Sequence, residues 1–539
     1  MISTSTLNKI KPKKTVIPLS LIVLFGLAVR FYYVPTDLQI VSDGFFDFVY
    51  ATKTVFEGSL PIGYGTTNTG WANFLSLFFS LSDTSDPFYL MQIQRSLSIV
   101  LSTITIIPAF FIFKRFVNVK FAIFGCFLLA VEPRLLLISL EGINFSLFFF
   151  LFVSAIALFL NKTNVSLFLT FVCIACASLV RYEAILLIIP FSIMFFVKFK
   201  GKKTIWKFLG IIFVLTIILV PISIIRIQAT EEYCHDSVFG VNCGKDGIIS
   251  NLLDRLASVN DKVVGIPDKD DPIYNTNSPM IEHFLFLSVS YLVKFLGLAL
   301  VPFFIFFVIL RIVLFVRKRK LGLNFDQKVI LSTTCIMLLP AIYAYGRGIE
   351  EVRYALIIIP IVCILSISGL KLVSDKISKN RNLLIISIVA VLILSIMLIE
   401  SEKRDVVHNY ESLLVGQEII KKTSTINSFN QDGYMKAASL INSWPELPNH
   451  NEKGKLEQEF IKIRTSNYDN VLDLIIDSKK YGLKYLVIDQ DDEIFYELRK
   501  NPANYPYLDK KFDSKDYGYT NNFKIYEINY RILENGKDG

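Results

Sequence analysis

Long apolar runs separated by short polar segments make up most of residues 1–400. Examples are residues 15–34, 167–180, 209–225 and 383–399. Many of these runs approach the roughly 20 residues with which an α-helix crosses a bilayer, and about eleven can be distinguished. The first run lacks a small-residue cleavage site at its end, so we expect it to remain as a span. The pattern predicts an all-α polytopic membrane domain of about eleven transmembrane helices.

Two long polar segments, at about 35–87 and about 228–283, interrupt this pattern. The first contains an amphipathic stretch, in which apolar residues recur at i, i+3, i+4 and i+7. This spacing predicts a helix that lies along the membrane interface. Ser42 and Asp43 are both suited to cap its N-terminus, and Gly58 is suited to end it.

Residues 401–539 lack any long apolar run and indicate a small soluble α/β domain. Such a domain would cover the membrane core or hold an acceptor, and a purely structural role fits equally well. The expected elements are strands at 460–464, 484–488 and 523–528 and a helix at 470–481 that Gly482 ends.

Lysine and arginine fall in every second loop between the apolar runs, in segments 9–14, 114–120, 198–207, 317–328 and 371–381. The positive-inside rule assigns such loops to the cytoplasm. We therefore expect a multi-pass protein of the cell membrane with a cytoplasmic N-terminus. An odd number of spans then places the C-terminal domain outside. This topology explains the net charge of +9, which is therefore no evidence for nucleic-acid binding.

Two of the seven cysteines, Cys234 and Cys243, lie in the second long outer loop. Because that side is oxidising in most cells, we predict a disulfide between them. The remaining cysteines lie in apolar runs, where a free cysteine behaves as a small hydrophobe.

Charged residues at membrane level are costly and mark functional candidates. Short loops bring a set of them into one layer on the expected outer side. There the planar fork of arginine suits phosphate oxygens, and a carboxylate can take a proton from an attacking hydroxyl. The set comprises Asp43, Asp47, Arg95, Glu132, Arg134, Glu141, Arg181, Glu183, Arg347, Glu350, Glu351 and Arg353.

Simpler roles stay open for several members of this set. Asp43 is suited to catalysis or to helix capping, and Asp47, one turn further on, would share the site or face water. Arg181 and Glu183 would serve a site or merely pair at the boundary of a span. Arg353, with the tyrosine after it, would bind phosphate or anchor the chain at the interface.

Evidence for a metal site is weak in the sequence. No histidine or cysteine pattern has the spacing of a zinc site. Asp489-Gln490-Asp491 resembles the metal-binding motif of nucleotide-sugar enzymes, but it follows an expected strand and precedes a helix, which is typical of N-capping. No cofactor is certain, although the clustered carboxylates leave a divalent metal open.

Three segments together resemble a known group. Residues 42–51, with Glu57-Gly58, place an aspartate just after the first span; residues 179–184 read Leu-Val-Arg-Tyr-Glu-Ala; and residues 351–355 read Glu-Val-Arg-Tyr-Ala. The three segments occur in this order, and all are expected on the outer side of the membrane. Together they resemble the GT-C superfamily of integral-membrane glycosyltransferases. The resemblance is to the family 39 branch of protein O-mannosyltransferases and aminoarabinose transferases. One departure is Gly44, where the mannosyltransferases often have glutamate.

The resemblance implies a GT-C-like fold and transfer of a sugar from a polyprenyl- or dolichyl-phosphate donor. The acceptor would be a hydroxyl of a protein, lipid or glycan at the outer membrane face, and the anomeric carbon would be inverted. On this hypothesis Asp43 would be the general base, Arg181 and Arg353 would bind the donor phosphate, and Asp47 and Glu183 would assist catalysis or a metal. Arg347 is a further candidate for the phosphate and Glu141 for catalysis or a metal, both from the cluster of charged residues on the outer side.

A polytopic transporter or lipid-linked-sugar flippase is the alternative function. Many spans and charged residues at membrane level fit it. However, the sequence shows no repeated halves, and the charged groups lie at one membrane face instead of at the midplane where transporters bind.

Overall fold

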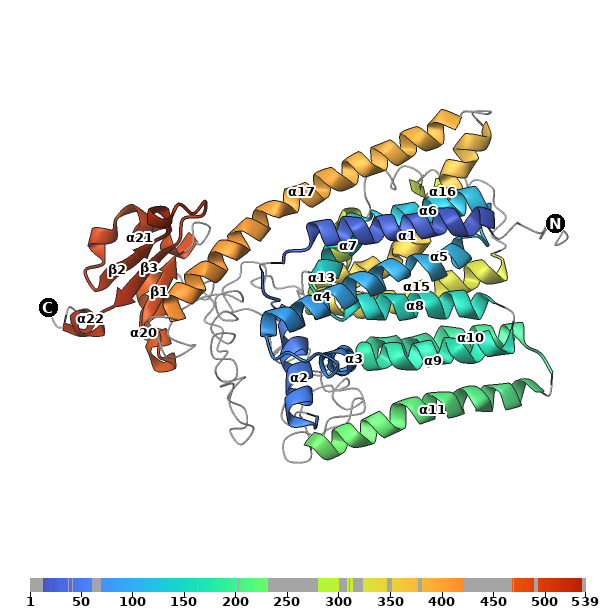
Figure 1. The fold of residues 1–539 in the computed structure, drawn as a ribbon, viewed down its shortest axis with the longest axis horizontal. Helices are drawn as coiled ribbons and strands as arrows, with labels where there is room; N and C mark the ends of the chain where they lie inside the picture. Colours follow the sequence, from blue (N-terminus) through green and yellow to red (C-terminus); the bar gives the residue numbers. More distant parts are fainter. Residues whose placement is uncertain are drawn as a thin grey trace.

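A helical bundle and a small α/β domain make up the computed structural model, and one long helix, α17, joins them (Figure 1). The structure describes residues 13–36, 38–40, 42–60, 69–161, 163–201, 203–230, 280–299, 308–309, 311–313, 323–346, 351–376, 381–420, 468, 470–488 and 493–535.

Most helices of the bundle run along its length, whereas α2 (Ser42–Glu57) lies across one end (Figure 1). The helices are α1 (Lys13–Tyr33), α2 (Ser42–Glu57), α3 (Gly70–Phe79), α4 (Pro87–Ile104), α5 (Ile106–Phe113), α6 (Val119–Ala130), α7 (Pro133–Leu140), α8 (Phe145–Leu160), α9 (Asn164–Val180), α10 (Ile188–Lys198), α11 (Lys203–Thr230), α13 (Met280–Ala299), α15 (Phe325–Gly346), α16 (Ile359–Lys376) and α17 (Arg381–Ile420), with 3-10 segments η1 (Tyr182–Leu187) and η3 (Val352–Ile358).

Several of these helices can cross a membrane by length and composition. Among the described residues five qualify, and a sixth candidate is the pair α6 and α7, which meet at 46° across a short break. Shorter apolar helices of 10–17 residues accompany them. The prediction of an all-α membrane domain is confirmed, whereas the described residues do not confirm the count of about eleven spans. The five are Thr15–Tyr33, Pro87–Phe113, Lys203–Ile222, Phe325–Gly346 and Val352–Ser374.

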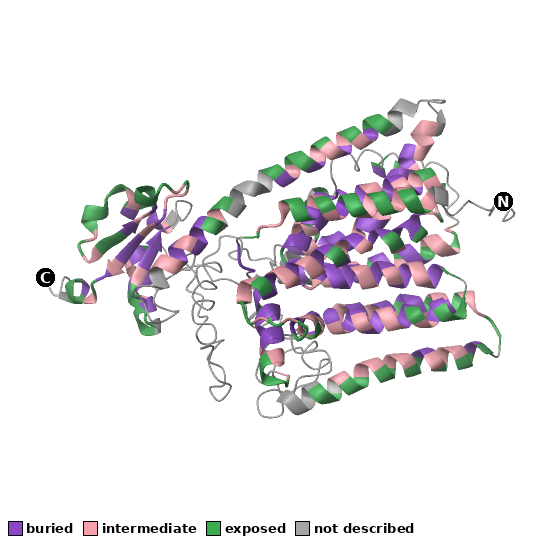
Figure 2. Cartoon of the chain, viewed as in Figure 1, coloured by how far each residue is buried: buried purple, intermediate pink, exposed green. Residues whose placement is uncertain are grey.

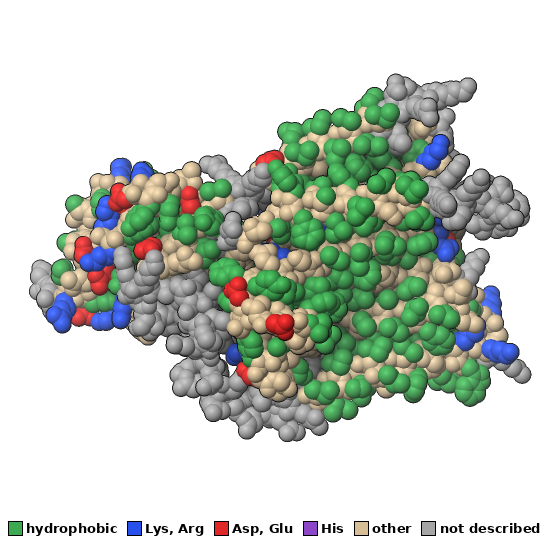
Figure 3. Space-filling view, in the orientation of Figure 1, with side chains coloured by type: hydrophobic (Ala, Val, Ile, Leu, Met, Phe, Trp, Pro, Cys, Tyr) green, Lys and Arg blue, Asp and Glu red, His purple; other side chains and the backbone are tan. Residues whose placement is uncertain are grey.

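Phenylalanine rings fill the middle of the bundle, where α8 packs against α4, α5 and α9. Phe152, Phe159 and Phe171 are fully buried there, and they hold the helices together mainly by close van der Waals packing. Outlying helices are different: α11 exposes Trp206 and Phe213, and Figure 2 shows mainly exposed and half-buried residues along it. The broad apolar surface in Figure 3 is typical of contact with lipid.

The break between α6 and α7 leaves backbone carbonyls that need partners within the bundle. Arg30 of α1, which is 1% exposed, donates from Nη1 to the carbonyl oxygen of Ala130 at 2.8 Å. At the same break the Oε2 atom of Glu132 accepts a hydrogen bond from the Leu135 amide at 2.7 Å and caps α7. In this structure these two charged residues support the backbone at a helix break.

Lysine and arginine side chains gather at the end of the bundle near the N-terminus (Figure 3). Lys198 shows how they fit: its Nζ donates to the carbonyl oxygens of Phe159, at 2.8 Å, and Asn161, at 3.2 Å. It also lies 5.1 Å from the centroid of the Phe159 ring. The described lysine- and arginine-rich loops therefore lie together at one end of the bundle.

The amphipathic helix predicted in the first long loop is α2 (Ser42–Glu57), whereas its expected position along the membrane interface stays a prediction. Its face with Phe45, Phe48 and Val49 is buried, and it packs against α3. Gly58 follows the helix with a φ of 65°, a left-handed conformation that glycine adopts without strain.

The C-terminal domain is a three-stranded antiparallel sheet with short helices. The strands β1 (Tyr485–Ile488) and β3 (Lys524–Ile528) confirm two predicted strands, and Gly482, at φ 86°, ends the predicted helix. The third predicted strand, 460–464, lies outside the described residues. The remaining elements are β2 (Leu508–Asp513), which the sequence did not reveal, α20 (Val471–Ser478), α21 (Tyr496–Lys500) and α22 (Tyr530–Asn535), and the strand order is β1-β3-β2.

The sheet of this domain has an apolar layer on each face. Leu486 and Tyr526 belong to the cluster that includes residues of α20 and α21. Val487 and Ile525 pack on the other face with Val415 of α17. Because α17 is continuous through residue 400, the expected division between residues 1–400 and 401–539 falls within one helix. That division stays a prediction.

Glu411 of α17 ties the helix to the C-terminal domain. Its Oε1 accepts hydrogen bonds from the backbone amide and hydroxyl of Thr520, and its Oε2 accepts from the backbone and side-chain amides of Asn521, over distances of 2.5–2.7 Å. Burial raises the pKa of Glu411, but these four hydrogen bonds outweigh it and lower the pKa below its usual value of 4.5.

We expect Glu411→Ala to destabilise the attachment of this domain by about 2–3 kcal/mol, because hydrogen bonds to a charged acceptor are lost. Since the folded pKa is lowered, the stabilisation is present at neutral pH and disappears as the pH falls below about 4.5. Limited proteolysis and thermal unfolding between pH 3 and 7 would measure both. Glu497→Ala, an exposed carboxylate of α21, is the control. Equal stability of Glu411→Ala and wild type at pH 7 would contradict the prediction.

Candidate functional site

Asp43 and Arg353 bring the first long loop and η3 together. Asp43 lies in the first turn of α2, and its Oδ2 is 2.6 Å from Nη2 of Arg353. Nε of the same guanidinium contacts the carboxylate of Glu351. The Asp43 side chain is 53% exposed, whereas that of Arg353 is 16% exposed. A largely buried cation is thus held by two carboxylates that solvent can reach.

A second ion pair lies where α9 ends. Arg181 is the C-terminal cap residue of α9, and its Nη2 is 2.9 Å from Oε1 of Glu183 in η1. Both side chains are about 10% exposed. The other carboxylate oxygen, Oε2 of Glu183, is buried and has no hydrogen-bond partner in the described part of the chain. It is therefore a candidate acceptor for a ligand.

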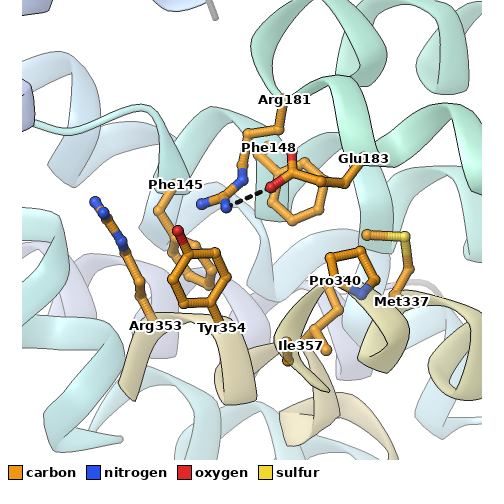
Figure 4. Close-up of a pocket in the computed structure, with 10 residues that line it drawn as sticks. Phe145, Phe148, Arg181, Glu183, Met337, Pro340, Arg353, Tyr354 and Ile357 are labelled. Carbon is orange, nitrogen blue, oxygen red and sulfur yellow. Dashed lines mark hydrogen bonds and ion pairs between the residues drawn. The ribbon is translucent and has the colours of Figure 1, made fainter. Parts of the chain in front are cut away.

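Tyr354 lies between the two arginines (Figure 4). Its ring centroid is 5.1 Å from the Arg181 guanidinium carbon and 5.6 Å from that of Arg353. Phe148 of α8 provides a second ring, 5.6 Å from Arg181. Cation–π contacts of this kind hold a guanidinium in place without neutralising it. Two positive charges are therefore fixed near each other at one site.

A pocket opens between these residues. It is a small hollow that is partly open to solvent. Its lining is mostly apolar with a few charged groups, as is typical of ligand sites. The lining residues are Phe145, Phe148, Arg181, Glu183, Met337, Pro340, Ala341, Arg353, Tyr354 and Ile357. A ligand with an anionic group and an apolar part fits this chemistry.

Gly70 fixes the position of α3 against the end of α9. A Cβ atom on Gly70 would lie 2.3 Å from the carbonyl oxygen of Leu179, so no other residue fits without moving the backbone. Leu179 is two residues before Arg181. The close packing of α3 on this segment therefore helps to hold the Arg181 backbone.

Two further expected site residues lie close to Asp43. Asp47, one turn further along α2, is buried. Burial raises its pKa well above the usual value, Asp43 raises it further, and Arg353 opposes the shift. Glu141 caps the C-terminus of α7, and its carbonyl oxygen would lie 3.0 Å from a Cβ atom on Gly44. Its backbone therefore adjoins the N-terminus of α2.

The structure gathers Asp43, Asp47, Glu141, Arg181, Glu183 and Arg353 around one region, as the sequence analysis expected. Arg347, Glu350, the cysteines Cys234 and Cys243, and Asp489-Gln490-Asp491 lie outside the described residues, so their expected roles stay predictions. The sequence analysis overlooked the ring of Phe148 and the buried amide of Gln94. The signal for Gln94 was a polar pair, Gln94-Arg95, within an apolar helix.

No group of three or more His, Cys, Asp or Glu side chains that could hold a metal ion occurs among the described residues. Of the two carboxylates on neighbouring turns of α2, Asp43 and Asp47, Asp43 is already paired with Arg353. A guanidinium at that position competes with a cation, so this arrangement fits a metal poorly.

Solved membrane glycosyltransferases have a similar fold. The Archaeoglobus fulgidus oligosaccharyltransferase in its apo form matches with a TM-score of 0.53 and 12% identity, over 89% of this chain and 70% of that chain. Its complex with Zn and sulfate matches with a TM-score of 0.51 and 13% identity, over 94% and 72%. ArnT from Cupriavidus metallidurans bound to undecaprenyl phosphate matches with a TM-score of 0.51 and 9% identity, over 96% and 98%.

These similarities confirm the expected GT-C-like fold, an all-α membrane domain with a small C-terminal domain. At such identities they establish the fold alone. No family model and no curated protein matches the sequence.

The buried carboxyl of Asp47 gives a test of the site's electrostatics. Because its folded pKa is raised, wild-type stability falls as the pH rises from about 3.8 towards that folded pKa. We expect Asp47→Asn to be as stable as wild type below about pH 3.8 and more stable at neutral pH. Thermal unfolding in detergent across this range would measure it, with Asp83→Asn as the exposed control. A destabilised Asp47→Asn at neutral pH would show that the carboxylate is ionised and satisfied.

Proposed function

We propose that the protein is a glycosyltransferase that moves a sugar from a polyprenyl-phosphate donor to a hydroxyl group at the outer membrane face. The observation that carries this proposal is the pocket at which Arg181 and Arg353 converge beside an accessible carboxylate, Asp43. The GT-C-like fold supports it, since one similar structure, that of ArnT, is bound to undecaprenyl phosphate.

In this proposal the two arginines bind the phosphate of the donor. The oxygens of a phosphate monoanion or dianion match the planar guanidinium fork of each arginine. Asp43 contacts Nη2 and Glu351 contacts Nε of Arg353, so the phosphate would compete with these two carboxylates for that guanidinium. Oε2 of Glu183 would then accept a hydrogen bond from a hydroxyl of the sugar.

Asp43 acts as the general base. The acceptor oxygen forms a bond to the anomeric carbon while the bond from that carbon to the phosphate oxygen breaks, with inversion of configuration. The acceptor proton passes to the Asp43 carboxylate, and the departing lipid phosphate keeps the bonding electrons. Arg181 and Arg353 stabilise the charge that develops on the phosphate. The acceptor is a protein, lipid or glycan hydroxyl.

The proposed orientation of the protein in the membrane is based on the basic end of the bundle. If that end faces the cytoplasm, the N-terminus is cytoplasmic, and Asp43, Arg353 and the C-terminal domain lie outside. A lipid-linked donor is available on that side, whereas nucleotide sugars are scarce there. Activity that survives chelation of divalent ions would fit the described residues, because no step above needs a metal.

A transporter or flippase is the second candidate. It would also need an anion-binding pocket in a membrane bundle. The pocket favours an enzyme, because an accessible carboxylate contacts the phosphate-binding Arg353. Proteoliposomes given a radiolabelled lipid-phosphate sugar would separate the two, since transfer to an acceptor and movement of the lipid between leaflets are measured independently.

We expect Asp43→Asn to reduce the rate of sugar transfer by about 100-fold to 10,000-fold, because a general base contributes that much. Purified protein, a polyprenyl-phosphate sugar and mass spectrometry of the products would measure it. Asp83→Asn, in the same outer loop, should retain full activity. Normal transfer by a folded Asp43→Asn variant would contradict the assignment.

Loss of Arg353 should mainly affect use of the donor. Arg353→Ala loses a charge-assisted contact of about 1.5–3 kcal/mol, which corresponds to a roughly 10-fold to 100-fold lower kcat/KM for the lipid donor. Arg353→Lys keeps the positive charge but lacks the planar fork, so its kcat/KM should lie between those of wild type and Arg353→Ala. Titration of both variants with undecaprenyl phosphate would show whether binding changes. Unchanged affinity would argue against a phosphate site at Arg353.

A further inference from the structure

Two consecutive polar residues of α4 are buried beneath the N-terminus of α2. Gln94 is 0% exposed and Arg95 is 3% exposed, although α4 is otherwise an apolar membrane helix. Polar side chains at such positions are costly unless their hydrogen bonds serve a purpose. Neither residue touches the pocket described above.

Gln94 uses both hydrogens of its amide on backbone carbonyls of two different segments. Its Nε2 donates to the carbonyl oxygen of Gly44 at 2.9 Å and to that of Gly142 at 2.8 Å. Trp71 of α3 also donates to the Gly142 oxygen, at 2.9 Å. Oε1 of Gln94 is buried and has no partner among the described residues. The amide is therefore committed to joining α2 to the turn between α7 and α8.

Glycine at both carbonyls allows this close approach. A Cβ atom on Gly44 would lie 2.7 Å from Cγ2 of Ile40 and 3.0 Å from the Glu141 carbonyl oxygen. Gly142 has a φ of 71°, and its Cβ would lie 3.0 Å from Cδ1 of Ile40. The start of α2 and the α7–α8 turn thus meet almost backbone to backbone. This explains why Gly44 follows Asp43 here.

Arg95 secures the chain on either side of these glycines. Its Nη1 donates to the carbonyl oxygens of Pro35, at 2.9 Å, and Leu38, its Nη2 donates to that of Gln39 at 3.0 Å, and its Nε donates to that of Leu140 at 3.2 Å. The segment before α2 and the end of α7 are both bound to α4. The Gln94 amide in turn holds the backbone of Gly44, the residue after Asp43.

We infer that Gln94 is a positioning residue for Asp43: it fixes the Gly44 backbone, and with it the neighbouring carboxylate, relative to Arg353 and the α7–α8 turn. The inference rests on the proposed function, in which Asp43 accepts the acceptor's proton. Displacement of a reacting group by about 1 Å can lower a rate by roughly 100-fold. Loss of the Gln94 contacts should therefore act on the chemical step.

Gln94→Met preserves the approximate size of the side chain and removes both donors. We expect kcat to fall by about 10-fold to 100-fold with little change in KM for the lipid donor, because Arg181 and Arg353 still bind the phosphate. Ser98→Ala is the matched control: Ser98 is buried in the same helix and its Oγ is 2.8 Å from that of Ser146, away from α2. It should retain normal kcat. Thermal unfolding would confirm that each variant folds.

The decisive measurement repeats Gln94→Met in the Asp43→Asn background under single-turnover conditions. If Gln94 acts through Asp43, its loss should have no further effect on the residual rate. The same fold-loss in both backgrounds would overturn the inference and leave the proposed function intact. A normal kcat in Gln94→Met, together with an inactive Asp43→Asn, would also overturn the inference and leave the proposed function intact. Full activity of Asp43→Asn would overturn both. If Gln94→Met does not fold, Gln94→Asn, which shortens the side chain by one methylene, makes the same test.

Discussion

A mostly buried arginine must be paired, and in this protein that requirement links distant parts of the chain. Arg353 lies at the start of the candidate span Val352–Ser374, yet its partner Asp43 lies in the first outer loop. Glu351 shares this guanidinium, so two carboxylates together supply the charge that it needs, and the one on Asp43 ties the first outer loop to η3. Arg181 and Tyr354 adjoin the same place. In the proposed chemistry, the buried arginine that requires an anionic partner in the fold is also the group that binds the donor phosphate.

The parts of the fold that the sequence predicted are those with a local signal. The spacing of apolar residues in α2 and the glycine after it define that helix without tertiary contacts. The strand at Lys524–Ile528 likewise has its own β-forming residues. In contrast, β2 reads Leu-Asp-Lys-Lys-Phe-Asp and is mostly exposed, so its conformation depends on pairing with β3. The number of spans also cannot be predicted from local sequence alone, because broken helices such as α6 and α7 depend on distant partners like Arg30.

For the site, residue types were predictable and their pairings were not. The cost of charge in a membrane singled out Asp43, Arg181 and Arg353. Nothing in the sequence states that Arg353 contacts Asp43 while Arg181 contacts Glu183, since such geometry arises only when the helices pack. Gln94 was missed for a related reason. A neutral amide carries no charge signal, and its role becomes visible only through the two carbonyls that it bonds.

The helix α17 gives the C-terminal domain a mechanical connection to the membrane. Near the bundle, Glu400 accepts a hydrogen bond from Tyr33 of α1 at 3.1 Å, and beyond that point the helix continues without a break to Ile420. Those last turns extend about 30 Å at the usual rise per residue. Over that length a tilt of about 10° would move the domain by about 5 Å. Small rotations of α1 and α7 would thus be amplified into displacements of a whole domain, as a rigid arm amplifies motion at its pivot.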